Sequence, residues 1–196
     1  MKKSLITILT VVGILLILVL WSSSRYNSLV TKQENVTAAW SQVENVYQRR
    51  ADLIPNLVNT VKGYADFEKS TLTAVIEARA KATSVTIDPT NMNEASMQQF
   101  QKAQDGLGSA LSRLMVVVEK YPDLKANQNF LDLQSQLEGT ENRITVERRN
   151  FNEAAQVYNT QIRRFPSNIF AGIFGFDKKA YFQAETGAEK APEVKF

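Results

Sequence analysis

Apolar residues recur along most of this chain at intervals of three and four residues, the spacing of one face of a helix. Three such stripes run from residue 26 to about 84, from about 94 to 121, and from about 123 to 165. Many of the apolar positions are seven residues apart, and such a repeat keeps a stripe against its neighbours when the helices supercoil left-handedly. No segment alternates with a period of two. The pattern therefore predicts an all-α protein, an antiparallel bundle of three to four long helices with left-handed heptad packing.

The breaks between the stripes carry turn and capping residues. The stretch TIDPTN at 86–91 separates the first two predicted helices, and YPD at 121–123 separates the second from the third. Asp, Thr and Asn are frequent N-cap residues, and the residue before a proline is disfavoured in a helix. Both stretches therefore predict chain reversals.

Pro55 interrupts the first stripe within the sequence RRADLIPNLV. A proline inside a helix removes one backbone donor and clashes with the preceding turn, at a cost of about 3 kcal/mol. In one alternative the helix continues through Pro55 with a kink, which the unbroken phase of the stripe favours. In the other the chain reverses at residues 51–54 and Pro55 starts a new helix, which matching of helix lengths favours. We expect only the reversal to bring the third helix back to the membrane-facing end.

The stripes also contain polar positions, which would face neighbouring helices. They are Gln33, Arg50, Glu68, Gln104, Thr140, Glu147 and Gln161. Polar core positions specify register and partner at some cost in stability, and we favour this interpretation over a ligand site. We predict that Arg50 meets Glu147 or another acid of the third helix.

The segment before the first stripe is apolar and uncharged. Residues 5–21 would span about 25 Å as a helix, near the lower limit for crossing a bilayer. Lys2 and Lys3 precede it and Trp21 closes it, as in a membrane anchor. A cleaved signal peptide is the alternative, but the apolar run is longer than is usual there. We predict a single-pass anchor in a bacterial cell membrane, with the following domain leaning towards the extracytoplasmic, periplasmic side.

The C-terminal part changes character twice. The stretch FPSNIFAGIFGF at 165–176 is apolar and contains glycine, and it could cap the bundle, dip into lipid or contact a protein. We single out its phenylalanines Phe165, Phe170, Phe174 and Phe176. The expected organisation is a basic N-terminus (1–4), an anchor (5–21), a bundle (25–165), an aromatic glycine-containing loop with a short helix or cap (166–186) and a flexible tail (187–196).

Composition removes many kinds of chemistry. The chain of 196 residues contains no Cys and no His, so thiolate nucleophiles, Ser-His triads and the usual zinc sites are excluded. The formal charge of +3 is spread among interleaved acids and bases rather than gathered in a basic block. We therefore expect no enzyme activity, no cofactor and no nucleic-acid partner.

Several long stretches, taken together, resemble the LemA family. They are YNSLV, AAWSQVENVYQRRADLIPNLVNTVKGYADFE, YPDLKANQNFLDLQSQLEGTENRITVERRNFNEAAQVYNTQIRRFPSN and IFGFDKKAYFQAE, in that order. The resemblance implies a bacterial protein with an N-terminal membrane helix and an antiparallel helical bundle. It implies no settled activity, cofactor or catalytic residue, and it leaves the orientation in the membrane open.

The anchor and the heptads favour a membrane-anchored scaffold or adaptor in the bacterial envelope that acts through homo-oligomerisation. The alternative is an accessory partner of an envelope stress or membrane-protein quality-control system, which would bind another envelope protein. Candidate interaction regions are the aromatic loop and residues 49–56, which contain Arg50, Pro55 and Asn56.

Overall fold

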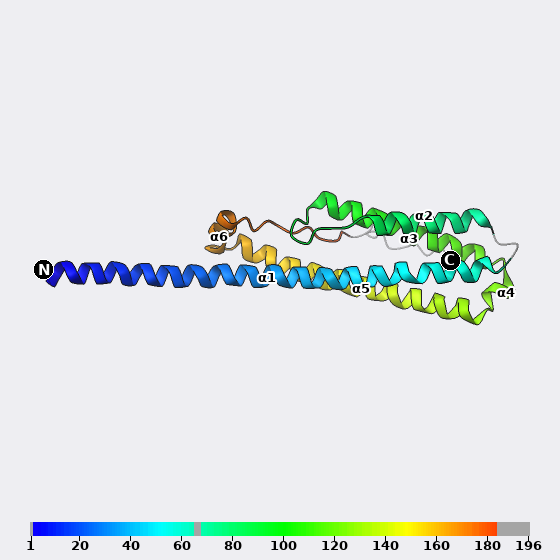
Figure 1. The fold of residues 1–196 in the computed structure, drawn as a ribbon, viewed down its shortest axis with the longest axis horizontal. Coiled ribbons are helices and arrows are strands. Elements are labelled where there is room, and N and C mark those ends of the chain that lie inside the picture. The colour runs from blue at the N-terminus through cyan, green and yellow to red at the C-terminus, as the bar shows by residue number, and fades with distance from the viewer. Residues whose placement is uncertain (1, 65–67, 184–196) are drawn as a thin grey trace, which may run out of the picture.

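The computed structural model describes residues 2–64 and 68–183, and these residues form helices and connecting segments without any strand. The helices are α1 (Lys2–Lys62), α2 (Lys69–Ser84), α3 (Glu94–Val118), α4 (Pro122–Lys125), α5 (Gln128–Arg163) and α6 (Ser167–Phe174). Helices α1, α2, α3 and α5 run alternately away from and towards the N-terminal end, as Figure 1 shows. The predicted all-α antiparallel bundle is confirmed. The expected flexible tail at 187–196 lies outside the described residues.

Local sequence signals place the helix ends. The Asn93 side chain accepts a hydrogen bond from the Ser96 amide at the start of α3, and the Ser96 hydroxyl accepts one from the Asn93 amide. This reciprocal pair is a capping box. Asn127 caps α5 by accepting from the amide of Phe130 at 3.1 Å. Gly175 ends α6 with a φ of 71°, in the left-handed region that favours glycine. Both predicted reversals, at 86–91 and 121–123, are present.

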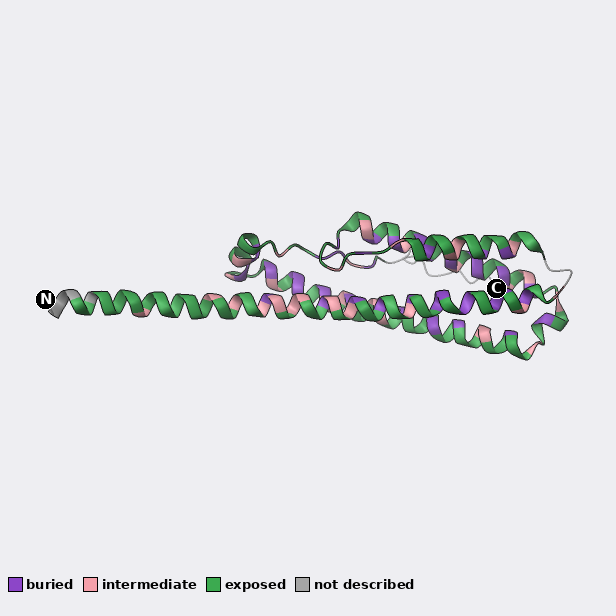
Figure 2. Ribbon diagram, in the orientation of Figure 1, coloured by how far each residue is buried: buried purple, intermediate pink, exposed green. Residues whose placement is uncertain are grey.

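The heptad positions form the core. The buried stripe residues of α1 include Leu29, Val36, Trp40, Val43, Tyr47, Ile54, Leu57 and Val61. On α5 the seven-residue series Phe130, Leu137, Ile144, Phe151 and Tyr158 is buried as well. Figure 2 shows the buried positions along the facing sides of the bundle helices. The series ends at Phe165, which lies beyond the end of α5 and is 81% exposed.

Helix α1 passes through Pro55 without interruption and is 61 residues long, which corresponds to about 90 Å. The first of the two alternatives for Pro55, continuation of the helix, is therefore the one observed. A proline at this position removes the amide that would bond to the carbonyl of Ala51. That carbonyl accepts instead from Arg79 Nε of α2, at 2.7 Å. The proline thus frees an acceptor in α1 that connects it to α2.

This arrangement makes the contribution of Arg79 depend on Pro55. In the native sequence, Arg79→Ala leaves the Ala51 carbonyl without this donor, and we expect a loss of about 1 to 2 kcal/mol in the free energy of unfolding. In a Pro55→Ala background, the restored amide of residue 55 can bond to Ala51, so the same change should cost about 0.5 kcal/mol or less. Urea unfolding of the four proteins of this double-mutant cycle measures the difference. Equal losses in the two backgrounds would contradict the exchange of donors.

Two expectations about the first stripe are wrong. The stripe is not one helix to about residue 84, because α1 ends at Lys62 and the chain reverses before α2 begins at Lys69. This reversal returns α5 to the N-terminal end, so the continuous α1 does not send the aromatic loop to the far end of the bundle. The loop instead packs beside α1, with the ring of Phe170 5.6 Å from that of Trp21.

After α6 the chain turns back along the bundle as an extended segment, residues 176–183, which we call the strap. The buried Phe182 of the strap contacts Trp40 of α1, Phe100 of α3 and Phe151 of α5. The strap therefore fills the space between α3 and α5 in the half of the bundle nearer to the N-terminus. Helix α1 packs along α5, and α2 packs along α3.

Candidate functional site

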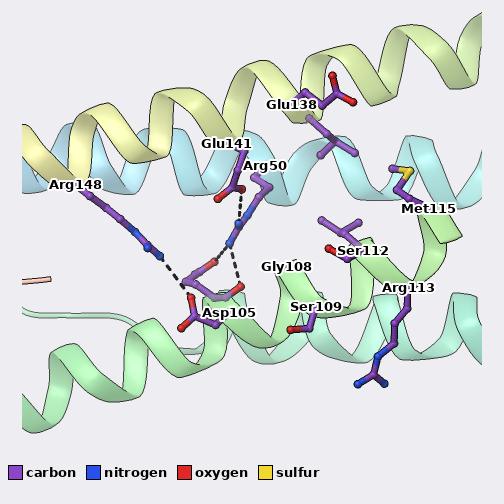
Figure 3. A pocket seen from close by; sticks show the side chains of 13 residues that line it. Arg50, Asp105, Gly108, Ser109, Ser112, Arg113, Met115, Glu138, Glu141 and Arg148 are labelled. Carbon is purple, nitrogen blue, oxygen red and sulfur yellow. Dashed lines mark hydrogen bonds and ion pairs between the residues drawn. The ribbon is translucent and has the colours of Figure 1, made fainter. Parts of the chain in front are cut away.

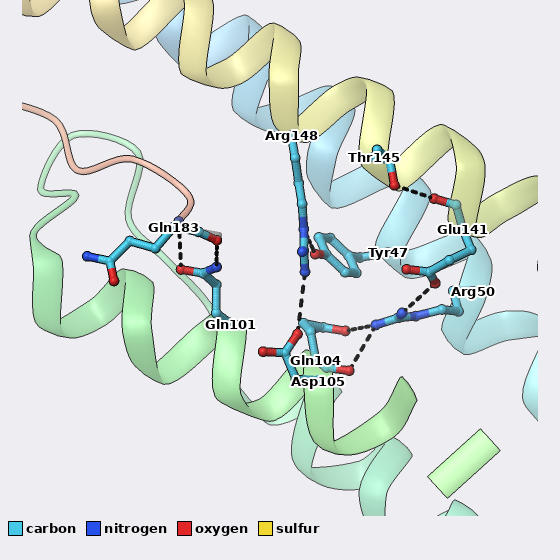
Figure 4. Close-up of polar contacts among 9 residues, drawn as sticks. All are labelled: Tyr47, Arg50, Gln101, Gln104, Asp105, Glu141, Thr145, Arg148 and Gln183. Atoms are coloured by element: carbon cyan, nitrogen blue, oxygen red, sulfur yellow. Dashed lines mark hydrogen bonds and ion pairs between the residues drawn. The ribbon is translucent and has the colours of Figure 1, made fainter. Parts of the chain in front are cut away.

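Arg50 lies at the polar centre of the bundle and is only 3% exposed. Its Nη1 donates to Glu141 of α5 at 2.8 Å, and its Nη2 donates to Oε1 of Gln104 of α3 at 2.7 Å (Figure 4). The guanidinium also lies over the Tyr47 ring, 5.0 Å from its centroid. Gln104 completes the arrangement by donating from Nε2 to the carbonyl of Ala82 at 3.2 Å. One buried arginine therefore connects α1, α3 and α5.

This polar layer separates the core into two hydrophobic clusters. One contains Trp40, Phe100 and Phe151 on the side of the N-terminus, and the other contains Leu57 and Leu114 on the far side. A buried charge is costly unless it is paired and hydrogen-bonded, and removing one partner of such a pair is strongly destabilising. Polar core positions can specify the register of neighbouring helices, and this role for the layer stays a prediction.

A second arginine, Arg148 of α5, lies next to this layer. Its Nε donates to the hydroxyl of Tyr47 at 2.6 Å, and its Nη2 is 3.6 Å from Oδ1 of Asp105 on α3. Burial raises the pKa of the Tyr47 phenol, while Arg148 and Arg50 oppose that rise. Tyr47 is therefore a neutral phenol at physiological pH, which accepts the hydrogen bond from Arg148.

A groove opens between α3 and α5 beyond this point, on the side away from the strap. It has a volume of about 880 Å³, and Figure 3 shows Arg148 and Asp105 towards one end, Met115 towards the other, and Arg50 and Glu141 between them. Its α3 wall carries the small residues Gly108, Ser109 and Ser112. The charged residues that line it are Arg50, Asp105, Arg113, Glu138, Glu141 and Arg148. The groove thus presents both signs of charge to solvent.

Amide side chains from α3 and α5 hold the backbone of the strap. Asn159 and Asn152 of α5 each donate to a carbonyl and accept from an amide of the strap, at Lys179 and at Phe182 respectively. Gln101 of α3 makes the same pair of bonds with Gln183 (Figure 4). An extended segment buried between helices has no sheet partner for its backbone, and these side chains replace one.

Lys179 of the strap is buried and donates from Nζ to the carbonyls of Pro89 and Thr90 in the loop before α3. Burial lowers the pKa of its ammonium group, while Asp177 and Asp88 oppose that change. The strap is therefore attached to the α2–α3 loop as well as to α3 and α5.

The residues singled out from the sequence fall into separate places. Arg50 is at the centre of the polar layer, but Pro55 and Asn56 are exposed on the next turns of α1. Glu147 is the wrong partner for Arg50, because its Oε2 accepts from Asn150 of its own helix at 2.9 Å. Arg50 pairs instead with Glu141, another acid of the same helix, whose side chain is 56% exposed. Burying one charge and leaving its partner in water avoids the desolvation of two charges.

The aromatic residues after α5 lie together at the N-terminal end of the bundle. Phe174 and Phe176 each contact Tyr26, with ring centroids 4.9 Å and 5.7 Å apart, and Phe170 contacts Trp21. Phe165 makes no such contact within the described residues and points to solvent. These aromatic residues and the buried Arg50 layer therefore lie in two separate parts of the bundle.

Sequence reasoning did not identify the residues that hold the strap, and it did not identify the groove. Gln101, Asn152 and Asn159 are ordinary polar residues of amphipathic helices until the fold brings an extended segment beside them. Gln104 did carry a signal, since it is a polar residue on an otherwise apolar stripe. Within residues 2–64 and 68–183, no three Asp or Glu side chains gather closely enough to hold a metal ion.

The fold and its surfaces define a class of protein: a helical bundle whose first helix continues into an exposed apolar N-terminal segment. Helix α1 alone among the described helices is long and apolar enough to cross a membrane, by length and composition. The family model of the LemA family matches residues 39–196. The chain belongs to the LemA family.

The relatives agree with this assignment. Magnetosome protein MamQ 2 of Paramagnetospirillum magneticum is 30% identical over 203 residues, which cover 94% of this chain and 72% of the relative. Magnetosome protein MamQ of Magnetospirillum gryphiswaldense is 29% identical over 184 residues, which cover 84% of this chain and 67% of the relative. Protein LemA of Metamycoplasma hominis is 28% identical over 160 residues, which cover 82% and 69%. These relatives and the apolar helix indicate a membrane-associated helical protein.

Proposed function

We propose that this protein is a non-enzymatic scaffold, anchored in a bacterial cell membrane by residues 5–21, that acts by homo-oligomerisation through the α3/α5 groove. The observation that carries the proposal is the groove itself, a solvent-open surface that is lined by charges of both signs and has the buried Arg50 in its wall. In a two-fold contact the same surface is used on both subunits. A surface bearing both signs can therefore pair with its own copy.

The structure offers specific charges for this contact. Arg113 on the α3 wall and Glu138 on the α5 wall are exposed, and neither takes part in the Arg50 network. In a two-fold pairing, Arg113 of one copy would meet Glu138 of the other. Lys2 and Lys3 favour a cytoplasmic N-terminus, whereas Arg25 and Lys32 on the other side of the anchor oppose it. From Lys2 and Lys3 we propose that the bundle lies on the extracytoplasmic side.

The test is the mass of the full-length protein in a mild detergent, measured by light scattering alongside electron microscopy. We expect a discrete assembly larger than one chain. Arg113→Glu should reduce the mass because it brings acids together across the contact, and Arg113→Glu combined with Glu138→Lys should restore it. Lys102→Glu, an exposed charge reversal on α3 outside the groove lining, is the matched control and should leave the mass unchanged.

A wild-type protein that stays monomeric under these conditions would overturn the self-association proposal. Crosslinking in vivo from Ser109, an exposed groove residue, would then identify what occupies the groove. A product containing a different envelope protein would support the alternative, an accessory role in envelope stress or membrane-protein quality control. A product containing two copies of this chain would support homo-oligomerisation.

A further inference from the structure

Helix α6 lies at the point where the apolar segment of α1 ends. The Phe170 ring of α6 contacts Trp21, which closes that segment, and the Phe174 ring contacts Tyr26 one turn further along α1. Trp21 and Tyr26 are five residues apart, which is about 8 Å along the helix axis. The headgroup region on one side of a bilayer has a similar thickness and adjoins the hydrocarbon core, as Trp21 and Tyr26 adjoin the apolar segment. Helix α6 is therefore positioned beside the membrane interface.

The outward face of α6 is apolar. Ile169 and Ile173 are 51% and 69% exposed, and Phe165 just before the helix is 81% exposed. Phe174, which packs on Tyr26 with part of its ring, is still 54% exposed at the edge of this face. Ile169 and Ile173 are four residues apart and so share one face of the helix. The opposite side is held to the bundle, since Ser167 and Ala171 are buried. An exposed apolar face of this kind marks an interaction site rather than a cap, which would bury these side chains.

The charges around this face are mostly positive. Arg163 and Arg164 precede the apolar stretch, and Asp177 and Lys178 follow it. On α1, the guanidinium of Arg25 lies 5.6 Å from the centroid of the Trp21 ring, at the same level. Helices that lie in the membrane interface combine an apolar face with basic neighbours, which are attracted to anionic headgroups. The chemistry therefore fits an anionic lipid surface.

We propose that α6 inserts Phe165, Ile169, Ile173 and Phe174 into the headgroup region of an anionic leaflet, the leaflet from which the bundle emerges. The protein then contacts one bilayer at two places, the apolar segment of α1 and the outward face of α6. A single helix leaves its domain free to rotate about the helix axis, whereas a second contact beside it removes that freedom. The α3/α5 groove would consequently have a fixed direction relative to the membrane surface.

The absence of cysteine from the chain allows the insertion to be measured with single labels on the full-length protein. Ile173→Cys carries an environment-sensitive fluorophore on α6, and Val116→Cys carries the same fluorophore on α3. Ile173 and Val116 are both 69% exposed, so Val116 is a matched control distant from α6. Both proteins are reconstituted in vesicles of phosphatidylcholine and phosphatidylglycerol, with a spin-labelled lipid as quencher.

We expect the label at Ile173 to be quenched by the lipid at least threefold more strongly than the label at Val116, and to be shielded from aqueous iodide. A label at Ile173 that iodide reaches as readily as at Val116 would overturn the proposal. A label shielded from both quenchers would overturn it as well, because a protein contact would then cover α6. The quenching ratio does not depend on oligomer mass, so failure here is distinguishable from failure of self-association.

The lipid composition tests the charge argument separately. In vesicles of phosphatidylcholine alone, quenching at Ile173 should fall by about half or more, because the attraction to Arg163, Arg164 and Arg25 is lost. Equal quenching in neutral and anionic vesicles would overturn the assignment of an anionic leaflet. Circular dichroism of each labelled protein verifies that the helical content is unchanged.

Discussion

Arg50→Ala should lower the free energy of unfolding by about 3 kcal/mol, because removing one partner of a buried, hydrogen-bonded charge network leaves the others unsatisfied. The change removes the donors to Gln104 and Glu141 and the cation over the Tyr47 ring. It also leaves a cavity between the two hydrophobic clusters. Urea unfolding of the full-length protein in a mild detergent, followed by tryptophan fluorescence, measures the loss.

The matched control is the partner acid. The side chain of Glu141 is 56% exposed, so water already solvates its carboxylate in the native protein. Water can also take the place of Arg50 as a hydrogen-bond partner of that carboxylate. Glu141→Gln keeps an oxygen that can accept from Arg50 but removes the counter-charge of a buried arginine, so it should cost about 1 kcal/mol, more than an exposed ion pair and less than Arg50→Ala. Losses of similar size for Arg50→Ala and Glu141→Gln would contradict the view that the buried arginine, and not the ion pair, holds the layer together.

The sequence was sufficient to predict the helical bundle because its apolar residues repeat with a helical period over long stretches. Trp40 and Val43 of α1 and Phe151 and Tyr158 of α5 are among the positions that the repeat identified as core, and all are buried. The same regularity concealed the first reversal. Val61 and Val75 are two heptads apart, so the stripe continues in phase across a turn. The signal that was missed is Gly63, which directly follows Lys62 at the end of α1, a common position for glycine after a helix.

Which acid pairs with Arg50 depends on how far the arginine side chain extends, and not on which residues share the stripe. Glu147 lies on the stripe and so was a natural partner for Arg50, whereas Glu141 lies at the edge of the helix face. A long arginine side chain can keep its stem in the core while its guanidinium reaches a partner at the surface. The link between Ala51 and Arg79 was equally hidden, because it requires the placement of α2 against α1.

The strap could not be predicted because its sequence, FDKKAYFQ at 176–183, is short and its apolar residues follow no helical period that would indicate what they pack against. Its burial depends on the space between α3 and α5 and on three amide side chains from other elements, Gln101, Asn152 and Asn159. Once the fold is known, its role follows. It fills the space between these helices in the half of the bundle nearer to the N-terminus.

Phe182→Ala should lower the free energy of unfolding by about 3 to 4 kcal/mol, the usual cost of removing a buried phenylalanine. Phe182 is 7% exposed, and its ring stacks on Trp40 at 5.9 Å and contacts Phe151 at 5.6 Å. The guanidinium of Arg148 also lies over the face of the Phe182 ring, 5.2 Å from its centroid. The matched control is Phe165→Ala, which removes a ring that is 81% exposed and should cost less than about 0.5 kcal/mol.

A double-mutant cycle separates the loss of a core ring from the loss of the strap. Asn152 holds the Phe182 backbone at 2.9 Å and 3.1 Å, so Asn152→Ala should cost about 1 to 2 kcal/mol. If each change releases the same segment, the second change has less left to remove, and the combined loss should fall short of the sum by about 1 kcal/mol. Additive losses in urea unfolding would mean that the strap stays docked without Phe182, held by Asn159 and the buried Lys179.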